Sequence, residues 1–288
     1  MTAPVVPILA DTIALAADIL DQGGLVALPT ETVYGLAADA SNGEAVARIY
    51  AAKGRPQFNP LIAHVSSLEM AEKEAEFPPL ARRCAEAFWP GPLTLVVPAR
   101  PDTRVSDLAR AGLDTIAIRW PAHRAAQALI QSLGRPLVAP SANKSGHVSP
   151  TRAYHVEADL GEEIDLIIDG GPCTVGVEST ILGFDGDTPV LLRPGGLSRE
   201  EIEEVLGQPV RLHTDDDGIT APGQLKSHYA PKAKVRLNVR SPEPGEGYLG
   251  FGPGESGGLN LSPSGDVAEA ASKLFAMLRA LDERFEKI

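Results

Sequence analysis

The chain has 288 residues, of which 43% are hydrophobic and 22% are charged, and its formal net charge is −12. This composition excludes a disordered chain, and no apolar run approaches the roughly 20 residues that span a bilayer. The negative charge disfavours an extended nucleic-acid surface, and Cys84 and Cys173 fit no metal-ligand spacing. We therefore expect a soluble cytoplasmic protein without membrane contact, whose cysteines stay reduced.

Helix and strand patterns alternate along the first two thirds of the chain. Helices are expected over 11–22, 42–53, 81–88, 122–133, 152–160 and from 198 onward, with caps at Asp11, Asn42 and Ser198. Strands are expected over 25–28, 61–65, 93–97, 115–119, 136–139, 166–169, 179–184 and 190–193. The last strands lie too close together for crossover connections, so we predict an α/β fold with a mixed sheet.

The pattern changes after residue 206. Polar and acidic residues with Pro and Gly predict an interdomain linker over 207–231. Beyond it we expect strands over 234–239, 248–251 and 259–261, and a long helix that Asp266 caps. The sequence therefore predicts a large domain over 1–206, a linker, and a small domain over 232–288.

Two segments of the chain contain cations and lack carboxylates. Lys53 and Arg55 flank Gly54 before a proline, with no Asp or Glu over residues 45–68, and the pattern returns over 115–155. Gly54 allows a sharp turn, and the proline extends the backbone of Arg55. Folded together, these segments would form a positive pocket for a compact polyanion such as a nucleoside triphosphate. The alternative is that acidic residues merely cluster elsewhere in the sequence.

Polar residues follow several of the expected strands. The segment 29–35 offers hydroxyls and a carboxylate where α/β sheets bind ligands, although a helix cap and a packed tyrosine would explain it equally. Ser141 and Asn143 could bind a ligand or close a turn. Likewise, Arg193 could pair with a surface carboxylate, and His64 could be a core residue.

Several catalytic motifs are absent from the sequence. It contains no P-loop, no Gly-x-Ser-x-Gly elbow, no Cys-x-x-Cys pair and no His-Glu-x-x-His helix. Covalent serine catalysis and a protein-bound zinc centre therefore lack support. Substrate positioning and electrostatic stabilisation remain as the sources of catalysis.

Taken together, these stretches resemble the threonylcarbamoyl-AMP synthase family, whose members contain a YrdC-like domain. The matching segments are 29–36, 53–56, 59–61, His64, 89–94, 117–119, 139–143, 176–181 and 192–195. Residues 221–223 and 228–231 look like the version with a C-terminal domain. The resemblance implies a twisted mixed sheet with flanking helices and an open cavity. It also implies a small Rossmann-like C-terminal domain, here either abbreviated or truncated.

The resemblance implies an enzyme, a nucleotidyltransferase that converts L-threonine, bicarbonate or CO2, and ATP into threonylcarbamoyl-AMP and pyrophosphate. Mg2+ would bind through the ATP phosphates rather than to a protein metal site. The product would pass to a tRNA threonylcarbamoyl transferase for threonylcarbamoyladenosine (t6A) formation next to the anticodon, and a direct contact with tRNA stays open.

Site residues follow from the family match. Those matching the ATP site are Lys53, Arg55, Asn59, Thr115, Ser141, Asn143, Ser149, Arg193 and Tyr229, with Lys53 and Arg55 as catalytic residues and Tyr229 as a lid. Those matching the L-threonine site are Thr30, His64, Arg119, Ala139 and Ser179, with Arg119 as the carboxylate clamp.

Two other classes of protein compete with this interpretation. One is a double-stranded RNA or tRNA-binding module without catalysis, which the scarcity of aromatic residues, 5%, disfavours. The other is a carbamoyl transferase module like that of hydrogenase-maturation proteins, whose acylphosphatase and zinc-finger segments are missing from this sequence.

Overall fold

The computed structural model describes residues 2–214, 221–222, 229–254 and 258–288. Its strands are β1 Val5–Pro7, β2 Val26–Leu28, β3 Gly35–Asp39, β4 Ile62–His64, β5 Leu93–Pro98, β6 Thr115–Arg119, β7 Leu137–Val138, β8 Leu166–Asp169, β9 Thr180–Asp185, β10 Thr188–Arg193, β11 Arg211–Leu212, β12 Leu249–Gly250 and β13 Leu259–Asn260. Its helices are α1 Ala10–Asp21, α2 Gly43–Lys53, α3 Leu68–Glu74, α4 Pro79–Phe88, α5 Asp107–Arg110, α6 Arg124–Leu133, α7 Ala153–Leu160, α8 Arg199–Leu206 and α9 Val267–Asp282.

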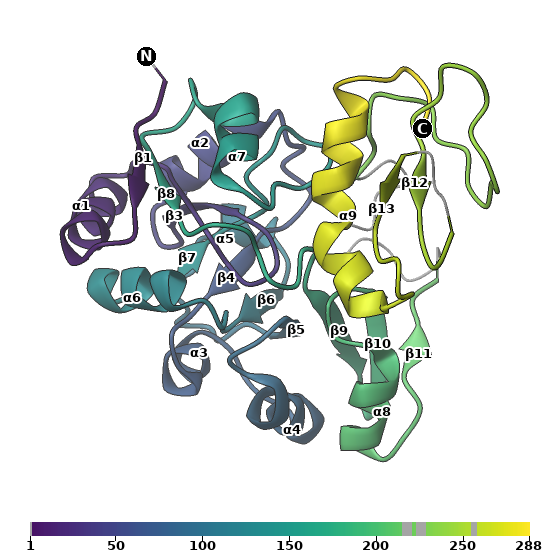
Figure 1. The fold of residues 1–288 in the computed structure, drawn as a ribbon. Coiled ribbons are helices and arrows are strands. Elements are labelled where there is room, and N and C mark those ends of the chain that lie inside the picture. Colours follow the sequence, from purple (N-terminus) through teal and green to yellow (C-terminus); the bar gives the residue numbers. More distant parts are fainter. Residues whose placement is uncertain (1, 215–220, 223–228, 255–257) are drawn as a thin grey trace.

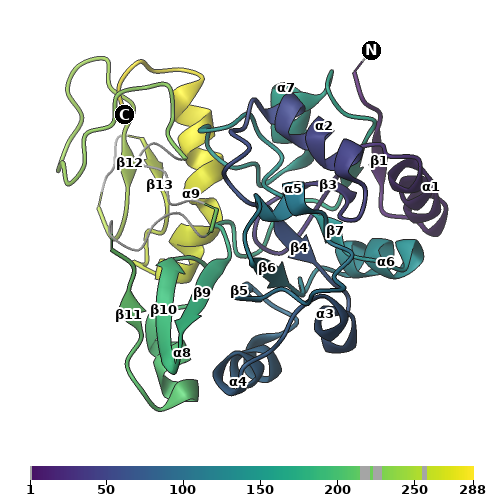
Figure 2. The ribbon, with the colours of Figure 1, turned by 180° about the vertical axis from the view of Figure 1, so that it is seen from behind.

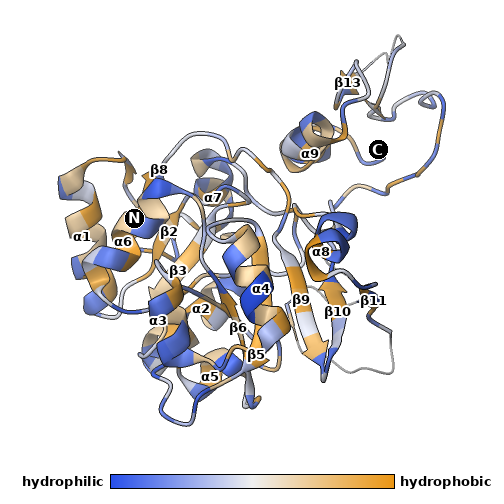
Figure 3. Cartoon of the chain, turned by 90° about the horizontal axis from the view of Figure 1, so that it is seen from below, coloured by the Kyte–Doolittle hydropathy of each residue, from blue (hydrophilic) through white to orange (hydrophobic). Residues whose placement is uncertain are grey.

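A mixed sheet forms the centre of the molecule, as predicted. In the described residues its strand order is β1-β8-β2-β3-β7-β4-β6-β5-β9-β10-β11. Parallel pairs such as β4 with β6 alternate with antiparallel pairs such as β5 with β6. Hydrophobic strands lie between helices whose outer sides are hydrophilic (Figure 3). No described helix combines the length and hydropathy needed to cross a membrane.

One face of this sheet is only half covered by helices. Strand register assigns Ala63, Ile118 and Val138 to the face that packs against α2, α4 and α7. On the opposite face, α1 and α6 lie side by side over β2, β8 and β3 (Figures 1 and 2). Over β4, β6, β5 and β9 the described residues on that face form a small cluster closed by Ala221. Part of the sheet is therefore open to a ligand.

Helix caps explain where several predicted elements begin. The Asn42 side chain accepts from two N–H groups of α2, Ser198 forms a capping box with Glu201, and Asp266 caps α9. The predicted Asp11 cap is wrong. Leu9 occupies the N-cap position of α1, and its N–H donates to Thr12 Oγ1 instead.

The C-terminal part contains a two-stranded parallel sheet, β12 with β13, beside α9. The strand predicted over 234–239 is absent from the structure, where Lys234 forms only an isolated bridge with Lys287. In Figure 1, α9 (yellow) lies between these strands and the large sheet. The predicted linker begins with β11, which extends the sheet beside β10. Residues 215–220 and 223–228 of that linker lie outside the described residues.

Candidate active site on the open sheet face

A pocket lies on the open half of the sheet, at the ends of β4, β6 and β10. Predicted site residues that line it are Thr30, Arg55, His64, Arg119, Ala139, Ser141, Ser179, Arg193 and Tyr229. Its free space for water is about 30 Å³, which holds one or two water molecules. Pro222 and Tyr229 of the predicted linker form part of its wall. A nucleotide therefore requires these residues to move.

Arg119 ends β6 and is anchored on three sides. Its Nη2 donates to Glu31 Oε1 at 2.5 Å, its Nη1 to Thr32 Oγ1 at 2.9 Å, and its Nε to the Gly91 carbonyl at 3.1 Å. Burial raises the pKa of Glu31, but the charge and hydrogen bonds of Arg119 outweigh it and leave that pKa below its ordinary value. Since a guanidinium has five N–H donors, two remain for a substrate carboxylate.

His64 presents a hydrogen-bond acceptor to the pocket. Its Nδ1 lies 3.0 Å from the Ile62 carbonyl, so Nδ1 carries the proton and Nε2 does not. Burial, and then the charge of Arg119, lower the pKa of His64 to about 3. The ring is therefore neutral at physiological pH, and Nε2 can accept a hydrogen bond.

Thr30 fixes the turn between β2 and β3. Its hydroxyl donates to the Val33 carbonyl at 2.7 Å and lies 2.8 Å from Thr32 Oγ1. Ser179 lies across the pocket, with its hydroxyl 2.8 Å from Thr94 Oγ1. Both hydroxyls line the pocket, so each can still contact a ligand.

Lys53 and Arg55 are buried without carboxylate partners among the described residues. Gly54 ends α2 in the left-handed conformation, with φ of 60°, and turns the chain between the two cations. Lys53 Nζ donates to the Ser141 and Asn143 carbonyls, each at 2.5 Å, and Arg55 donates to the carbonyls of Asn59 and Pro60. Burial and the charge of Arg55 lower the pKa of Lys53 to about 7.

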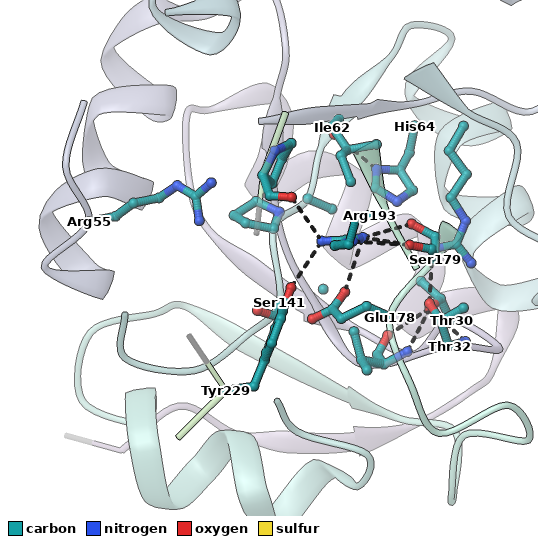
Figure 4. A pocket seen from close by; sticks show the side chains of 16 residues that line it. Thr30, Thr32, Arg55, Ile62, His64, Ser141, Glu178, Ser179, Arg193 and Tyr229 are labelled. Carbon is teal, nitrogen blue, oxygen red and sulfur yellow. Dashed lines mark hydrogen bonds and ion pairs between the residues drawn. The ribbon is translucent and has the colours of Figure 1, made fainter. Parts of the chain in front are cut away.

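Arg193 lies at the centre of the pocket (Figure 4). It donates to the Ser179 carbonyl and hydroxyl at 2.9 and 3.0 Å and to the Tyr229 hydroxyl at 3.0 Å. Its Nη2 lies 3.7 Å from Glu178 Oε2. Arg55 reaches toward it from the other side, so two guanidinium groups face one pocket.

Buried amides near these cations lack hydrogen-bond partners among the described residues. Both amide atoms of Asn59 and Oδ1 of Asn143 are unsatisfied, although each side chain is 1% exposed. A buried polar atom without a partner costs about 1–3 kcal/mol. These atoms are free to form hydrogen bonds with water or with a polar ligand.

The sequence interpretation missed two groups that line the pocket, Glu178 and Thr32. Ser149, predicted for the ATP site, donates from its hydroxyl to Glu178 Oε1 at 2.6 Å and so contacts the pocket through that carboxylate. Glu178 belongs to the matching segment 176–181, which is the signal that could have identified it.

Thr115 lies apart from the other predicted residues. It is four residues from Arg119 along β6, about 13 Å at about 3.3 Å per residue. It lines a second cavity of about 480 Å³ with Phe184 and Arg211. Ala221 covers the sheet between the two cavities, packed with Ile62 and Ala117.

Several cations of the carboxylate-free segments do have acidic partners, from distant parts of the chain. Arg48 pairs with Asp165, and Lys144 with Glu163. Arg135 pairs with both Asp21 and Asp39. The alternative of clustered acids therefore holds for these residues, whereas Arg55 lines the pocket and Lys53 lies buried outside its lining.

The chain is similar to known proteins over nearly its whole length. The family model described as "Telomere recombination" matches residues 18–195, and that described as "Threonylcarbamoyl-AMP synthase, C-terminal domain" matches 197–288. A threonylcarbamoyl-AMP synthase of Bacillus subtilis is 48% identical over 236 residues, covering 80% of this chain and 68% of that protein. One of Pyrococcus abyssi is 45% identical over 292 residues, covering 94% and 85%. The solved structure of P. abyssi Sua5 complexed with L-threonine is 42% identical with a TM-score of 0.89, covering 98% of this chain and 89% of that one.

Proposed function

Because the chain belongs to the threonylcarbamoyl-AMP synthase family, we propose that its pocket joins L-threonine, bicarbonate or CO2, and ATP into threonylcarbamoyl-AMP, releasing pyrophosphate. The observation that carries this proposal is the convergence of Arg55, Arg193 and Arg119 on one pocket. The solved structure of a relative is a complex with L-threonine, which supports L-threonine as the amino-acid substrate. The reaction takes place in the cytoplasm, and the product passes to a tRNA threonylcarbamoyl transferase.

The chemistry requires no protein nucleophile. The neutral threonine amine adds to CO2 and loses one proton to water, which forms a carbamate. A carbamate oxygen then attacks the α-phosphorus of ATP, and pyrophosphate leaves with the electron pair of the broken P–O bond. The protein therefore accelerates the reaction by holding two anions together and neutralising the charge that develops.

Threonine is assigned to the end of the pocket near β6. The two remaining N–H donors of Arg119 suit the threonine carboxylate, and Nε2 of His64 accepts a hydrogen bond from an N–H or O–H group of threonine. The hydroxyls of Thr30 and Ser179 and the backbone of Ala139 complete this half.

ATP is assigned to the opposite end of the pocket. Lys53, Arg55 and Arg193 neutralise its phosphates, and the unsatisfied amides of Asn59 and Asn143 gain partners. The hydroxyls of Ser141 and Ser149 and that of Tyr229 lie in the same half or at its wall. The nucleoside then extends across the sheet toward Thr115 once Ala221 leaves its place between the cavities.

Mg2+ is expected on the ATP phosphates. Among the described residues no group of three or more His, Cys, Asp or Glu could hold a metal by itself. Glu178 supplies a carboxylate at the pocket wall, and carboxylate and phosphate oxygens are the ligands that Mg2+ prefers. The ion would neutralise charge on the departing pyrophosphate.

Pyrophosphate release from ATP tests the proposal. We expect release that requires both threonine and bicarbonate. Release that is independent of threonine would contradict it. No release together with tight tRNA binding would favour the RNA-binding alternative.

A further inference from the structure

Helix α9 of the C-terminal part contacts the loop that carries Ser149. Arg279, on the last turn of α9, donates from Nε and Nη2 to the Val148 carbonyl, at 3.1 and 2.5 Å. The same guanidinium binds both carboxylate oxygens of Asp159, at 3.3 and 2.7 Å. One side chain therefore joins α9 to this loop and to α7.

These contacts are shielded from solvent. The side chains of Arg279 and Asp159 are each 13% exposed, whereas Lys273 and Glu269 on the same helix are each 38% exposed. Exposed ion pairs contribute about 0–1 kcal/mol, and breaking a buried pair costs far more. The ion pair between Arg279 and Asp159 is therefore stronger than that between Lys273 and Glu269.

Apolar contacts reinforce the position of α9. Phe275 is 7% exposed and packs with Val33, which lines the pocket, and with Val148, the neighbour of Ser149. The ring of Tyr229 stacks on Phe275, with centroids 5.9 Å apart and planes 23° apart. A single helix thus supports the Ser149 loop and the tyrosine that lines the pocket.

The contacts form a closed circuit through the site. From α9, Arg279 holds Val148, the neighbour of Ser149, whose hydroxyl donates to Glu178. Glu178 lies beside Arg193, and Arg193 donates to the hydroxyl of Tyr229. The ring of Tyr229 stacks on Phe275, which is part of α9. A displacement of Val148 therefore changes the position of groups assigned to ATP.

We propose that Arg279 is a positioning residue for the nucleotide half of the site, acting through the Val148 carbonyl on Ser149 and Glu178. This inference rests on the proposed function, because it takes that half to bind ATP. It assigns the C-terminal part a direct share in forming the site. Arg279 hydrogen-bonds to none of the threonine residues, and the first groups that it positions, Ser149 and Glu178, lie in the ATP half, so we expect its effect to be larger for ATP.

The test measures the dissociation constants of ATP and of threonine separately, by calorimetry, for Arg279→Gln in the full chain. We expect ATP binding to weaken about tenfold, since small displacements of binding groups have large effects, while threonine binding changes less than about twofold. Lys273→Gln removes a cation from the same helix without touching the pocket wall and should leave both constants unchanged. Arg279→Lys should restore part of the loss, because an ammonium still reaches one acceptor.

Equal weakening of ATP and threonine would overturn the inference, as would a lower melting temperature with unchanged ATP binding. If Arg279→Gln does not fold, Asp159→Asn decides by the same two constants, because it loosens Arg279 while leaving its bonds to Val148. For Asp159→Asn we expect ATP affinity to fall less than for Arg279→Gln, with threonine affinity unchanged. Unchanged ATP affinity would again contradict the inference. Failure of the proposed function would look different, since the wild-type protein would then show no threonine-dependent pyrophosphate release.

Discussion

Carbonyl groups, not carboxylates, surround the two cations at the end of α2. Lys53 and Arg55 donate to four backbone carbonyls from two loops, and neither is hydrogen-bonded to a carboxylate in the described part of the chain. Carbonyl groups accept the hydrogen bonds of Lys53 and Arg55 without neutralising their positive charge. The pocket therefore keeps a positive potential in a protein with a net charge of −12, which favours a polyanionic ligand.

Removing one of these cations should abolish ATP use. For Arg55→Ala we expect at least about 100-fold weaker ATP binding, because each charge-assisted hydrogen bond contributes about 1.5–3 kcal/mol. Arg48→Ala, on α2 just before Arg55 in the chain, is a control, since Arg48 forms an exposed pair with Asp165. Calorimetric titration of ATP checks both variants, and equal affinities would contradict the role of Arg55.

The pH dependence of ATP binding should report on Lys53. Its pKa in the free protein is about 7, and a bound triphosphate favours the charged amine and raises that pKa. Binding therefore takes up a proton above pH 7, and affinity should fall by up to about tenfold per pH unit between pH 7.5 and 9. ATP itself stays ionised in this range, because phosphate pKa values lie near 6. Lys53→Arg should lose this dependence, and the same slope in both proteins would refute the explanation.

Arg119 should affect threonine more than ATP. Arg119→Lys keeps a positive charge beside Glu31 but loses the planar fork, so we expect the KM for threonine to rise about tenfold or more while that for ATP changes little. Arg119→Ala is a poorer test, because an unpaired buried Glu31 costs about 3–5 kcal/mol. Steady-state kinetics with each substrate varied in turn provides the measurement, and a parallel rise in both KM values would exclude the clamp.

At the scale of elements, local patterns identified most helices and strands, and tertiary contacts decided the rest. The segment 29–35 suits either a ligand loop or a helix cap, yet β3 begins within it, at Gly35, because its backbone pairs with β2. The opposite error occurred over 234–239, where an alternating pattern has no neighbouring strand to pair with, apart from one bridge. Sequence patterns report which residues suit a strand, whereas pairing depends on what lies beside it.

The site could be predicted in part for the same reason. Nine of the fourteen predicted residues line one pocket. Lys53, Asn59, Asn143 and Ser149 lie outside its lining, and Ala221 separates Thr115 from it. The partners of the cations could not be predicted, because Glu31 lies 88 residues from Arg119 and Asp159 lies 120 residues from Arg279. Pairs of such long separation depend on how the whole sheet is assembled.

At the scale of the whole molecule, a glycine controls how closely α9 approaches the pocket. Gly176 has φ of +71°, and a Cβ there would lie 2.4 Å from the Ser272 carbonyl oxygen on α9. We expect Gly176→Ala to displace α9 and to lower the free energy of unfolding by several kcal/mol. Gly54→Ala, with φ of +60° and nothing within 4 Å, should cost only about 1–2 kcal/mol. Urea denaturation of both variants measures this difference, and equal losses would show that the contact with α9 is unimportant.

The central claim is that one pocket builds a mixed anhydride from threonine, CO2 and ATP without a protein nucleophile. Incubation with ATP, threonine and 14C-bicarbonate, followed by separation of the nucleotides and mass spectrometry, tests it most directly. The account predicts label in an adduct with the mass of threonylcarbamoyl-AMP, formed only when threonine is present and released with one pyrophosphate each. Absence of label from the nucleotide fraction, or label bound covalently to the protein, would contradict it.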